Sequence, residues 1–226
     1  MPLQIAIDGP VASGKSTVAR LLARRLGCTF LDTGALYRAV ALSVLQHGIA
    51  PDDERTVASL VVSADPKIIV DQTQPLGYKI RVGGRAVGEE LFSPAVSQAV
   101  SAIAANAGVR KHLIAAQRDF ADDRDVIMAG RDIGSVVLPD ASFKFFLTAT
   151  VEARVDRRLR ELRDKGIAIE RETLTEEIAR RDERDRTRKA SPLIVAPDAI
   201  VIDTSALSVD QVVDLLEAKV REARSA

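Results

Sequence analysis

The feature that most constrains the fold is a glycine-rich stretch near the N-terminus, Gly9-Pro10-Val11-Ala12-Ser13-Gly14-Lys15-Ser16-Thr17. It follows the apolar run Ile5-Ala6-Ile7 and leads into a helical pattern that begins near Lys15. This is the pattern G-x-x-x-x-G-K-[ST] between a strand and a helix, which is the context that a P-loop requires. The stretch therefore predicts a phosphate-binding turn inside an α/β fold.

The residue types of the predicted P-loop suit that chemistry. Gly9 and Gly14 let the backbone turn tightly with its N–H groups pointing inward, and the following helix adds its positive end. Lys15 would reach between the β- and γ-phosphates of a nucleotide as a point charge, and the Ser16 hydroxyl would ligate Mg²⁺. The stretch thus predicts a nucleoside triphosphate site.

Strand and helix patterns alternate through most of the chain, which favours a parallel sheet covered by helices. We expect helices over residues 15–26, 33–47, 94–105, 109–120 and 209–222, and strands over residues 29–31, 125–129, 143–147 and 199–202. Polar residues directly follow two of these strands, in Asp32-Thr33-Gly34-Ala35-Leu36-Tyr37-Arg38 and in the loop Gly130-Arg131-Asp132-Ile133-Gly134-Ser135. In open α/β sheets, ligands bind at this end of the strands.

Two segments depart from this alternation. Residues 62–92 contain three short strand-like runs around a double glycine, which predicts a small antiparallel insertion. Residues 151–190 carry 13 basic and 11 acidic residues, a composition typical of two solvated helices joined by a mobile hairpin. We expect the break at Lys165-Gly166 and a capping box of Thr173 and Glu176 at the start of the second helix.

Two pairs of neighbouring residues at the predicted sheet edge, Arg131-Asp132 and Tyr37-Arg38, are candidates for holding a second ligand. Arg131-Asp132 lies on a glycine-flanked loop, where it could face a ligand or form a local salt bridge that holds the turn. Tyr37 and Arg38 lie near the start of a helix at the same edge and could grip a second phosphate. Judged alone, a surface arginine and a core tyrosine explain them about as well.

Arginines in residues 151–190 fall on two helical faces. One face carries Arg154, Arg157 and Arg158, and the other carries Arg181, Asp185 and Arg188. Guanidinium groups arranged in this way can clamp phosphates bidentately, whereas composition alone favours ion pairs along exposed helices.

Composition argues against several other classes of protein. Basic and acidic residues number 32 each, so no overall field draws the chain to nucleic acid or to an anionic membrane. The single cysteine, Cys28, excludes an intrachain disulfide, and no run approaches the roughly 18 apolar residues of a membrane span. With 226 residues and 46% hydrophobic content, we expect one compact domain. The absence of a disulfide framework suits the reducing cytoplasm, where we expect the protein to be located.

Five stretches together resemble the bacterial cytidylate kinases, a family of nucleoside monophosphate (NMP) kinases, over nearly the whole chain. The stretches are residues 8–17, 31–38, 130–134, 137–141 and 181–186. Their order and spacing make the resemblance more specific than the P-loop alone. It implies an α/β P-loop kinase fold with a five-stranded parallel sheet core, a small antiparallel NMP-binding insertion and a helical LID.

The resemblance also implies a domain plan and a reaction. A single domain, residues 1–226, would comprise a core of residues 1–61, 93–150 and 190–226, the NMP-binding insertion at 62–92, and the LID with its flanking helices at 151–189. The enzyme would transfer the γ-phosphoryl group of ATP to CMP or dCMP with Mg²⁺, giving the diphosphate and ADP. Neither nucleic acid nor a membrane is implied as a partner, and a monomer is expected.

Site residues follow from the resemblance position by position. The P-loop residues Gly9, Pro10, Val11, Ala12, Ser13, Gly14, Lys15, Ser16 and Thr17 would bind ATP, with Arg157 and Arg158 closing over it and Ser16 binding the metal. Arg38 and Arg131 would hold the acceptor phosphate, Ser101, Arg110 and Asp132 would read the cytosine edge, and Tyr37 would line that pocket. Arg181 and Asp185 would contact the sugar, and Arg188 would lie by the transferring phosphate. Lys15, Arg131, Arg188 and Arg157 are the expected catalytic residues.

Two positions differ from the family pattern. Thr33 stands where relatives often have serine, and we expect its hydroxyl to substitute in the acceptor site. Ala129 stands immediately before Gly-Arg-Asp, where relatives often have Asp or Glu, so any part that this carboxylate plays around the metal is missing here.

Other functions are compatible with a P-loop. A kinase for another nucleotide or a small metabolite would differ in a few pocket residues only. A GTPase-type switch would need an Asn-Lys-x-Asp motif, but the only asparagine is Asn106 in Asn-Ala-Gly. A nucleic-acid motor is disfavoured by the balanced charge and by an aromatic content of 4%.

Overall fold

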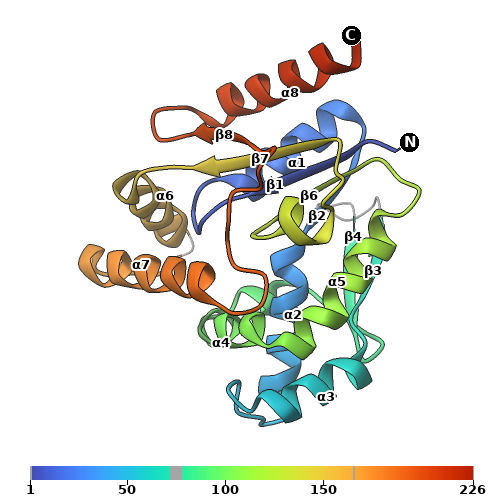
Figure 1. Ribbon diagram of the computed structural model, residues 1–226. Helices are drawn as coiled ribbons and strands as arrows, with labels where there is room; N and C mark the ends of the chain where they lie inside the picture. Colours follow the sequence, from blue (N-terminus) through green and yellow to red (C-terminus); the bar gives the residue numbers. More distant parts are fainter. Residues whose placement is uncertain (1, 72–77, 165, 226) are drawn as a thin grey trace.

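The computed structural model describes residues 2–71, 78–164 and 166–225 (Figure 1). Its elements are β1 (Gln4–Asp8), α1 (Lys15–Leu26), β2 (Thr29–Asp32), α2 (Thr33–Gln46), α3 (Glu54–Ala64), β3 (Lys67–Val70), β4 (Tyr78–Val82), β5 (Arg85–Val87), η1 (Glu89–Phe92), α4 (Pro94–Ala105), α5 (Ala107–Ala121), β6 (Val126–Gly130), η2 (Ile133–Val137), β7 (Phe143–Thr148), α6 (Val151–Asp164), α7 (Arg171–Thr187), β8 (Ile200–Asp203) and α8 (Val209–Ser225). Within these residues, no helix is both long and apolar enough to cross a membrane.

The core is a five-stranded parallel sheet, as predicted, and its strand order is β2-β6-β1-β7-β8. β1 lies between β6 and β7, and its last residue, Asp8, is in register with Gly130 at the end of β6. The P-loop and the Gly-Arg-Asp loop therefore leave the sheet from neighbouring strands. Parallel sheets covered on both faces give strands that are apolar throughout, and Ile5 to Ile7 and Val126 to Ala129 are fully buried.

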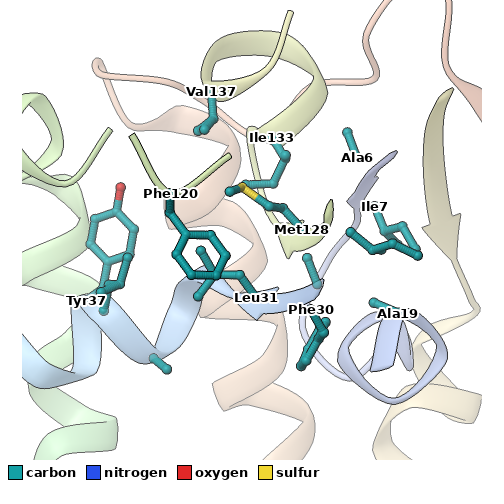
Figure 2. Packing of buried hydrophobic residues seen from close by; sticks show 14 of the residues in the cluster. Ala6, Ile7, Ala19, Phe30, Leu31, Tyr37, Phe120, Met128, Ile133 and Val137 are labelled. Carbon is teal, nitrogen blue, oxygen red and sulfur yellow. The ribbon is translucent and has the colours of Figure 1, made fainter. Parts of the chain in front are cut away.

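One hydrophobic core surrounds this sheet (Figure 2). Ile7 and Met128 come from the central strands, while Phe120 comes from α5 and Ile133 from η2. Helix α1 also packs against α8, and α2 packs against α4. The loop expected after β6 is instead partly a π-helical turn, η2, in which the Val137 N–H donates to the Asp132 carbonyl at 3.1 Å. This turn places the backbone after Asp132 against the core.

The antiparallel strands predicted in the insertion are confirmed as a separate sheet in the order β3-β4-β5. The expected start of the insertion, residue 62, falls inside α3, a helix that we did not predict. Asp53 caps α3 by accepting a hydrogen bond from the Thr56 N–H at 3.1 Å, and Val57 and Val61 are its fully buried contacts with the core. The helix therefore runs continuously across the expected boundary.

Helices α6 and α7 pack side by side at the edge of the molecule, and we call this pair the LID (Figure 1). The expected break at Lys165-Gly166 falls partly outside the described residues, because Lys165 is not described. The capping box of Thr173 and Glu176 is wrong, since α7 already begins at Arg171. Arg171 pairs with Asp156 of α6 at 2.6 Å, so contact between the helices starts before Thr173.

Candidate functional site

A cavity of about 370 Å³ opens where β1, β2 and β6 end. Seven cationic and four acidic side chains line it, which leaves an excess of three positive charges. Lys15 of the P-loop and Arg131 of the loop after β6 both face this one cavity. The charge and the position at the carboxyl ends of the strands suit a ligand that carries several negative charges.

The P-loop forms a tight turn that requires glycine at two positions, Gly9 and Gly14. Gly9 has φ 154°, and a Cβ at this position would lie 2.1 Å from the Leu147 carbonyl oxygen. Gly14 has φ 87° and precedes the first residue of α1, so the helix begins immediately behind the turn. Of the predicted P-loop residues, the cavity is lined by Val11, Ala12, Gly14, Lys15, Ser16 and Thr17, and not by Gly9, Pro10 or Ser13. The turn and helix N-terminus thus form a cradle for anions at one end of the cavity.

Lys15 lines the cavity, and its ammonium group is held by a hydrogen bond to the P-loop backbone. Its Nζ donates to the Pro10 carbonyl at 3.0 Å, and the side chain is buried. Burial lowers the pKa of Lys15 well below its ordinary value, and the nearby charge of Arg131 lowers it further. A phosphate placed beside Lys15 would oppose both effects and favour the charged ammonium group.

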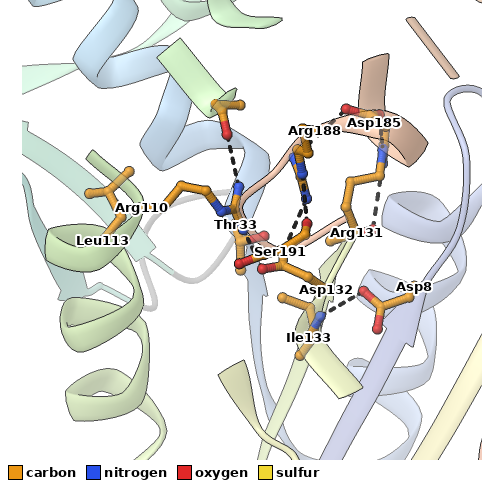
Figure 3. A network of polar contacts seen from close by, with 12 residues as sticks. Asp8, Thr33, Arg110, Leu113, Arg131, Asp132, Ile133, Asp185, Arg188 and Ser191 are labelled. Carbon is orange, nitrogen blue, oxygen red and sulfur yellow. Dashed lines mark hydrogen bonds and ion pairs between the residues drawn. The ribbon is translucent and has the colours of Figure 1, made fainter. Parts of the chain in front are cut away.

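Asp8 connects the P-loop strand to η2, a role that we did not predict. Its carboxylate accepts a hydrogen bond from the Ile133 N–H (Figure 3) and another from the Gly134 N–H, each at 2.8 Å. Burial raises the pKa of Asp8 to about 6, although the two backbone hydrogen bonds lower it in part. Its position as the last residue of the strand before the P-loop was the signal available in the sequence. Asp8 thereby fixes the turn that carries Asp132.

A network of arginines and carboxylates faces the cavity from the loop after β6 and from α7 (Figure 3). Arg131 Nε donates to Asp185 Oδ2 at 2.8 Å, so Arg131 pairs with α7 rather than with its neighbour in the sequence. Arg188 Nε donates to the Ser191 carbonyl at 2.6 Å, and its Nη1 lies 3.8 Å from Asp185 Oδ1. Burial would raise the pKa of Asp185, but the charges of these arginines hold it below its ordinary value.

A second ion pair is almost completely buried deeper in the cavity. Arg110 of α5 donates to Asp132 and also to the Ala104 carbonyl, the latter at 3.0 Å. Its guanidinium lies 5.3 Å from the centre of the Tyr37 ring. Burial raises the pKa of Tyr37 to about 12, so the phenol stays neutral. These three side chains form a polar recess suited to the hydrogen-bonding edge of a ligand.

The remaining predicted acceptor residues also reach the cavity. Arg38 donates to the Leu91 carbonyl at 3.1 Å and to Ser97 Oγ at 2.9 Å. Ser101 and Arg181 line the cavity, and burial followed by the charge of Arg131 lowers the pKa of Arg181 to about 10. Arg38, Arg131 and Arg181 therefore all line the same cavity.

Thr33 and Asp32 lie where β2 passes into α2. Thr33 Oγ1 donates to the Ala129 carbonyl at 3.0 Å, which ties the start of α2 to β6. Asp32, which we did not predict as a site residue, lines the cavity and caps α2 by accepting from the Gly34 N–H at 3.0 Å. A carboxylate directly between a strand and a helix was its signal in the sequence.

The two arginines expected over ATP occupy different positions. Arg158 lines the cavity and pairs with Glu161 at 2.7 Å. Arg157 does not line the cavity, because its Nη1 donates to Thr204 Oγ1 at 3.0 Å on the loop after β8. Consecutive positions on a helix point about 100° apart, so one of the two faces away.

The sequence model of the cytidylate kinase family matches residues 5–222. The chain belongs to this family. Cytidylate kinase from Caldanaerobacter subterraneus subsp. tengcongensis is 44% identical over 222 residues, which cover 98% of this chain and 96% of that relative. Cytidylate kinase from Thermotoga sp. strain RQ2 is 42% identical over 222 residues, 98% of each chain.

Solved structures of other kinases share the fold. Shikimate kinase from Bacteroides thetaiotaomicron superposes with a TM-score of 0.50 at 13% identity, over 97% of this chain and 98% of that one. A gluconokinase from Sinorhizobium meliloti 1021 gives a TM-score of 0.51 at 13% identity, over 98% of this chain and 93% of that one. The chain therefore has the P-loop kinase fold, as predicted.

Few side chains in this family member could hold a metal ion. Across residues 2–71, 78–164 and 166–225, no group of three His, Cys, Asp or Glu side chains could bind one. Ser16 lines the cavity, whereas Asp132 and Asp185 are engaged by arginines and Ala129 offers no side-chain donor. This donor set fits Mg²⁺ that arrives on a nucleotide and keeps phosphate and water ligands.

Proposed function

We propose that this chain transfers the γ-phosphoryl group of ATP to CMP or dCMP, giving ADP and CDP or dCDP. The observation that carries the proposal is the single cavity shared by Lys15 of the P-loop and Arg131, in a chain of the cytidylate kinase family. One cavity with cations at both ends can bring two anionic nucleotides together.

The donor would occupy the P-loop end of the cavity. The backbone N–H groups of the turn and Lys15 would hold the phosphates of ATP, and Arg158 would approach from the LID. Ser16 would ligate Mg²⁺, which would supply further neutralisation of the phosphate charge. Arg157 would have to leave Thr204 before it could contact ATP.

The acceptor would occupy the other end of the cavity. Arg38 and Arg131 would hold its phosphate, which places a nucleophilic oxygen toward the P-loop. Ser101, Arg110 and Asp132 would read the cytosine edge, and Tyr37 would line that pocket. Thr33 would help hold the acceptor. Arg181 and Asp185 would contact the sugar, and Arg188 would lie by the transferring phosphate.

The reaction needs positioning and charge neutralisation more than a general base. An oxygen of the acceptor phosphate is already anionic, so it can attack the γ-phosphorus while the bond to the β-phosphate oxygen breaks. Lys15, Arg131 and Arg188 would neutralise the charge that spreads over the transferring group. Closure of the insertion at 62–92 and of the LID would exclude water and prevent hydrolysis of ATP.

Acceptor profiling tests the proposal. We would measure kcat/KM with saturating ATP and Mg²⁺ for CMP, dCMP, UMP, AMP and GMP. CMP or dCMP should exceed AMP and GMP by about a hundredfold or more, because the hydrogen-bonding edge of a purine would not match the donors and acceptors that the buried Arg110 and Asp132 present. Faster phosphorylation of AMP or GMP would contradict the base-reading role, and no transfer to any nucleoside monophosphate would favour a different small acceptor.

A further inference from the structure

The tip of the P-loop is held by the LID. The Val11 N–H donates to Asp182 Oδ1 of α7 at 3.3 Å, and the Val11 carbonyl accepts from Arg154 Nη1 of α6 at 3.2 Å. The same Nη1 donates to Asp182 Oδ2 at 2.5 Å, so an ion pair between the two LID helices grips both backbone polar groups of one P-loop residue. The LID therefore contacts the P-loop through its main chain.

The side chain of Val11 strengthens this contact. It packs against a small hydrophobic cluster of Val155, Leu174 and Ile178, which lies between α6 and α7 and is separate from the main core. Val11 thus has apolar as well as polar contacts with the LID. Movement of the LID away from the P-loop would break all of them together.

Arg154 and Asp182 are committed to this arrangement. Arg154 is 5% exposed, and its Nε donates to the Ala149 carbonyl at 3.2 Å, so its guanidinium is fixed from a second side. Neither residue lines the cavity. A buried ion pair contributes little net stability by itself, so the main effect of this pair is on the orientation of the groups that it contacts.

Ala12 directly follows Val11, so the contacts of Val11 with the LID also restrain Ala12. It has φ 57°, a left-handed conformation that residues with a Cβ rarely adopt, and it lines the phosphate end of the cavity. Strained backbone of this kind persists only when the surroundings fix it. Val11, held at its N–H, its carbonyl and its side chain, provides that restraint on one side of Ala12.

We propose that Arg154 and Asp182 are positioning residues that hold the P-loop tip in its phosphate-binding conformation. The donor site is then complete only while both LID helices are docked on Val11. The inference rests on the proposed function only in taking ATP as the donor. Binding of ATP and docking of the LID favour each other, because both require the same conformation of the tip.

The experiment compares Arg154→Gln, Asp182→Asn and the double variant with the wild-type protein. Calorimetry would give the affinity for the Mg²⁺ complex of a non-hydrolysable ATP analogue and, separately, for CMP. Each single variant should bind the analogue about tenfold more weakly with CMP affinity changed less than about twofold. The double variant should bind the analogue no more weakly than the worse single variant, because all three variants lose the same Arg154–Asp182 ion pair. Amide exchange at Val11 should also accelerate in Arg154→Gln.

Arg171→Gln is the matched control. It removes the Arg171 to Asp156 pair, which joins the same two helices at the surface and does not line the cavity. It should leave analogue affinity and Val11 exchange unchanged. Wild-type analogue binding in both single variants, an equal loss of CMP affinity, or an equal loss in Arg171→Gln would overturn the inference. If the variants bind the analogue more weakly but the wild-type protein does not phosphorylate CMP, the proposed function is refuted and this inference stands.

Discussion

Replacing Asp132 by alanine should destabilise the ligand-free protein. Asp132 and Arg110 are 4% and 2% exposed and are hydrogen-bonded to each other. The second carboxylate oxygen of Asp132 lies 3.7 Å from Arg188 Nη2. Removal of the carboxylate leaves the Arg110 guanidinium buried, with the Ala104 carbonyl as its remaining hydrogen-bond acceptor among the described residues.

The expected magnitude follows from these contacts. Removing one partner of a buried ion pair costs about 3 to 5 kcal/mol of unfolding free energy. We expect about 3 kcal/mol, the lower end, because the Ala104 carbonyl and the Tyr37 ring still face the guanidinium. Asp132→Asn keeps an acceptor of similar size and should cost about 1 to 2 kcal/mol. Arg110→Met combined with Asp132→Ala should cost less than the sum of the two single changes.

Urea unfolding of the ligand-free variants at pH 7 measures these differences. Glu183→Gln is the control, because it removes a pair with Arg186 in which both side chains are mostly exposed, and it should leave the unfolding midpoint unchanged. The reasoning fails if Asp132→Ala unfolds within about 0.5 kcal/mol of wild type. Strict additivity in the double variant would refute it as well, since it would mean that the two side chains do not interact.

Three further changes test other parts of the site. Lys15→Ala should lower kcat about a hundredfold or more in an assay of ADP release, with no fall in thermal stability, because Lys15 is a buried cation beside other cations. Gly9→Ala should cost about 2 kcal/mol or more by thermal unfolding, since its Cβ would lie 2.1 Å from the Leu147 carbonyl. Burial raises the folded-state pKa of Asp8 from 3.8 to about 6, so the folded protein retains this proton longer than the unfolded chain. Unfolding free energy should fall by up to about 3 kcal/mol from this group between pH 4 and 6, and urea unfolding should show a flatter fall in Asp8→Asn.

Local signals in the sequence predicted much of the fold. The glycine-rich turn after an apolar run located β1 and α1. The helix expected over residues 209–222 is α8, and Ser208 and Gln211 cap it with reciprocal hydrogen bonds of 2.8 and 3.2 Å. Helix α3 was missed although Val57 and Val61 have helical spacing, because the run Val61-Val62 and the strand-like residues after it also suit an extended chain. Both interpretations satisfy the local pattern, and only packing against the core separates them.

Side-chain contacts between residues that lie far apart in the sequence could not be predicted from the sequence. Arg154 and Arg157 share a helical face with Arg158, yet one pairs with Asp182 and the other with Thr204, and only Arg158 lines the cavity. The family resemblance assigned positions to one site but could not show which arginines are already engaged by protein groups. That information depends on how the LID docks on the P-loop.

The register between β1 and β6 has a consequence for how this enzyme can diversify. Asp8 and Gly130 are paired residues on neighbouring strands, about 4.8 Å apart, so peptide hydrogen bonds set the spacing between the starts of the P-loop and the Gly-Arg-Asp loop. If the base is read by Ser101 of α4 and Arg110 of α5 as proposed, substitutions in these two helices would alter the preferred base without changing that spacing.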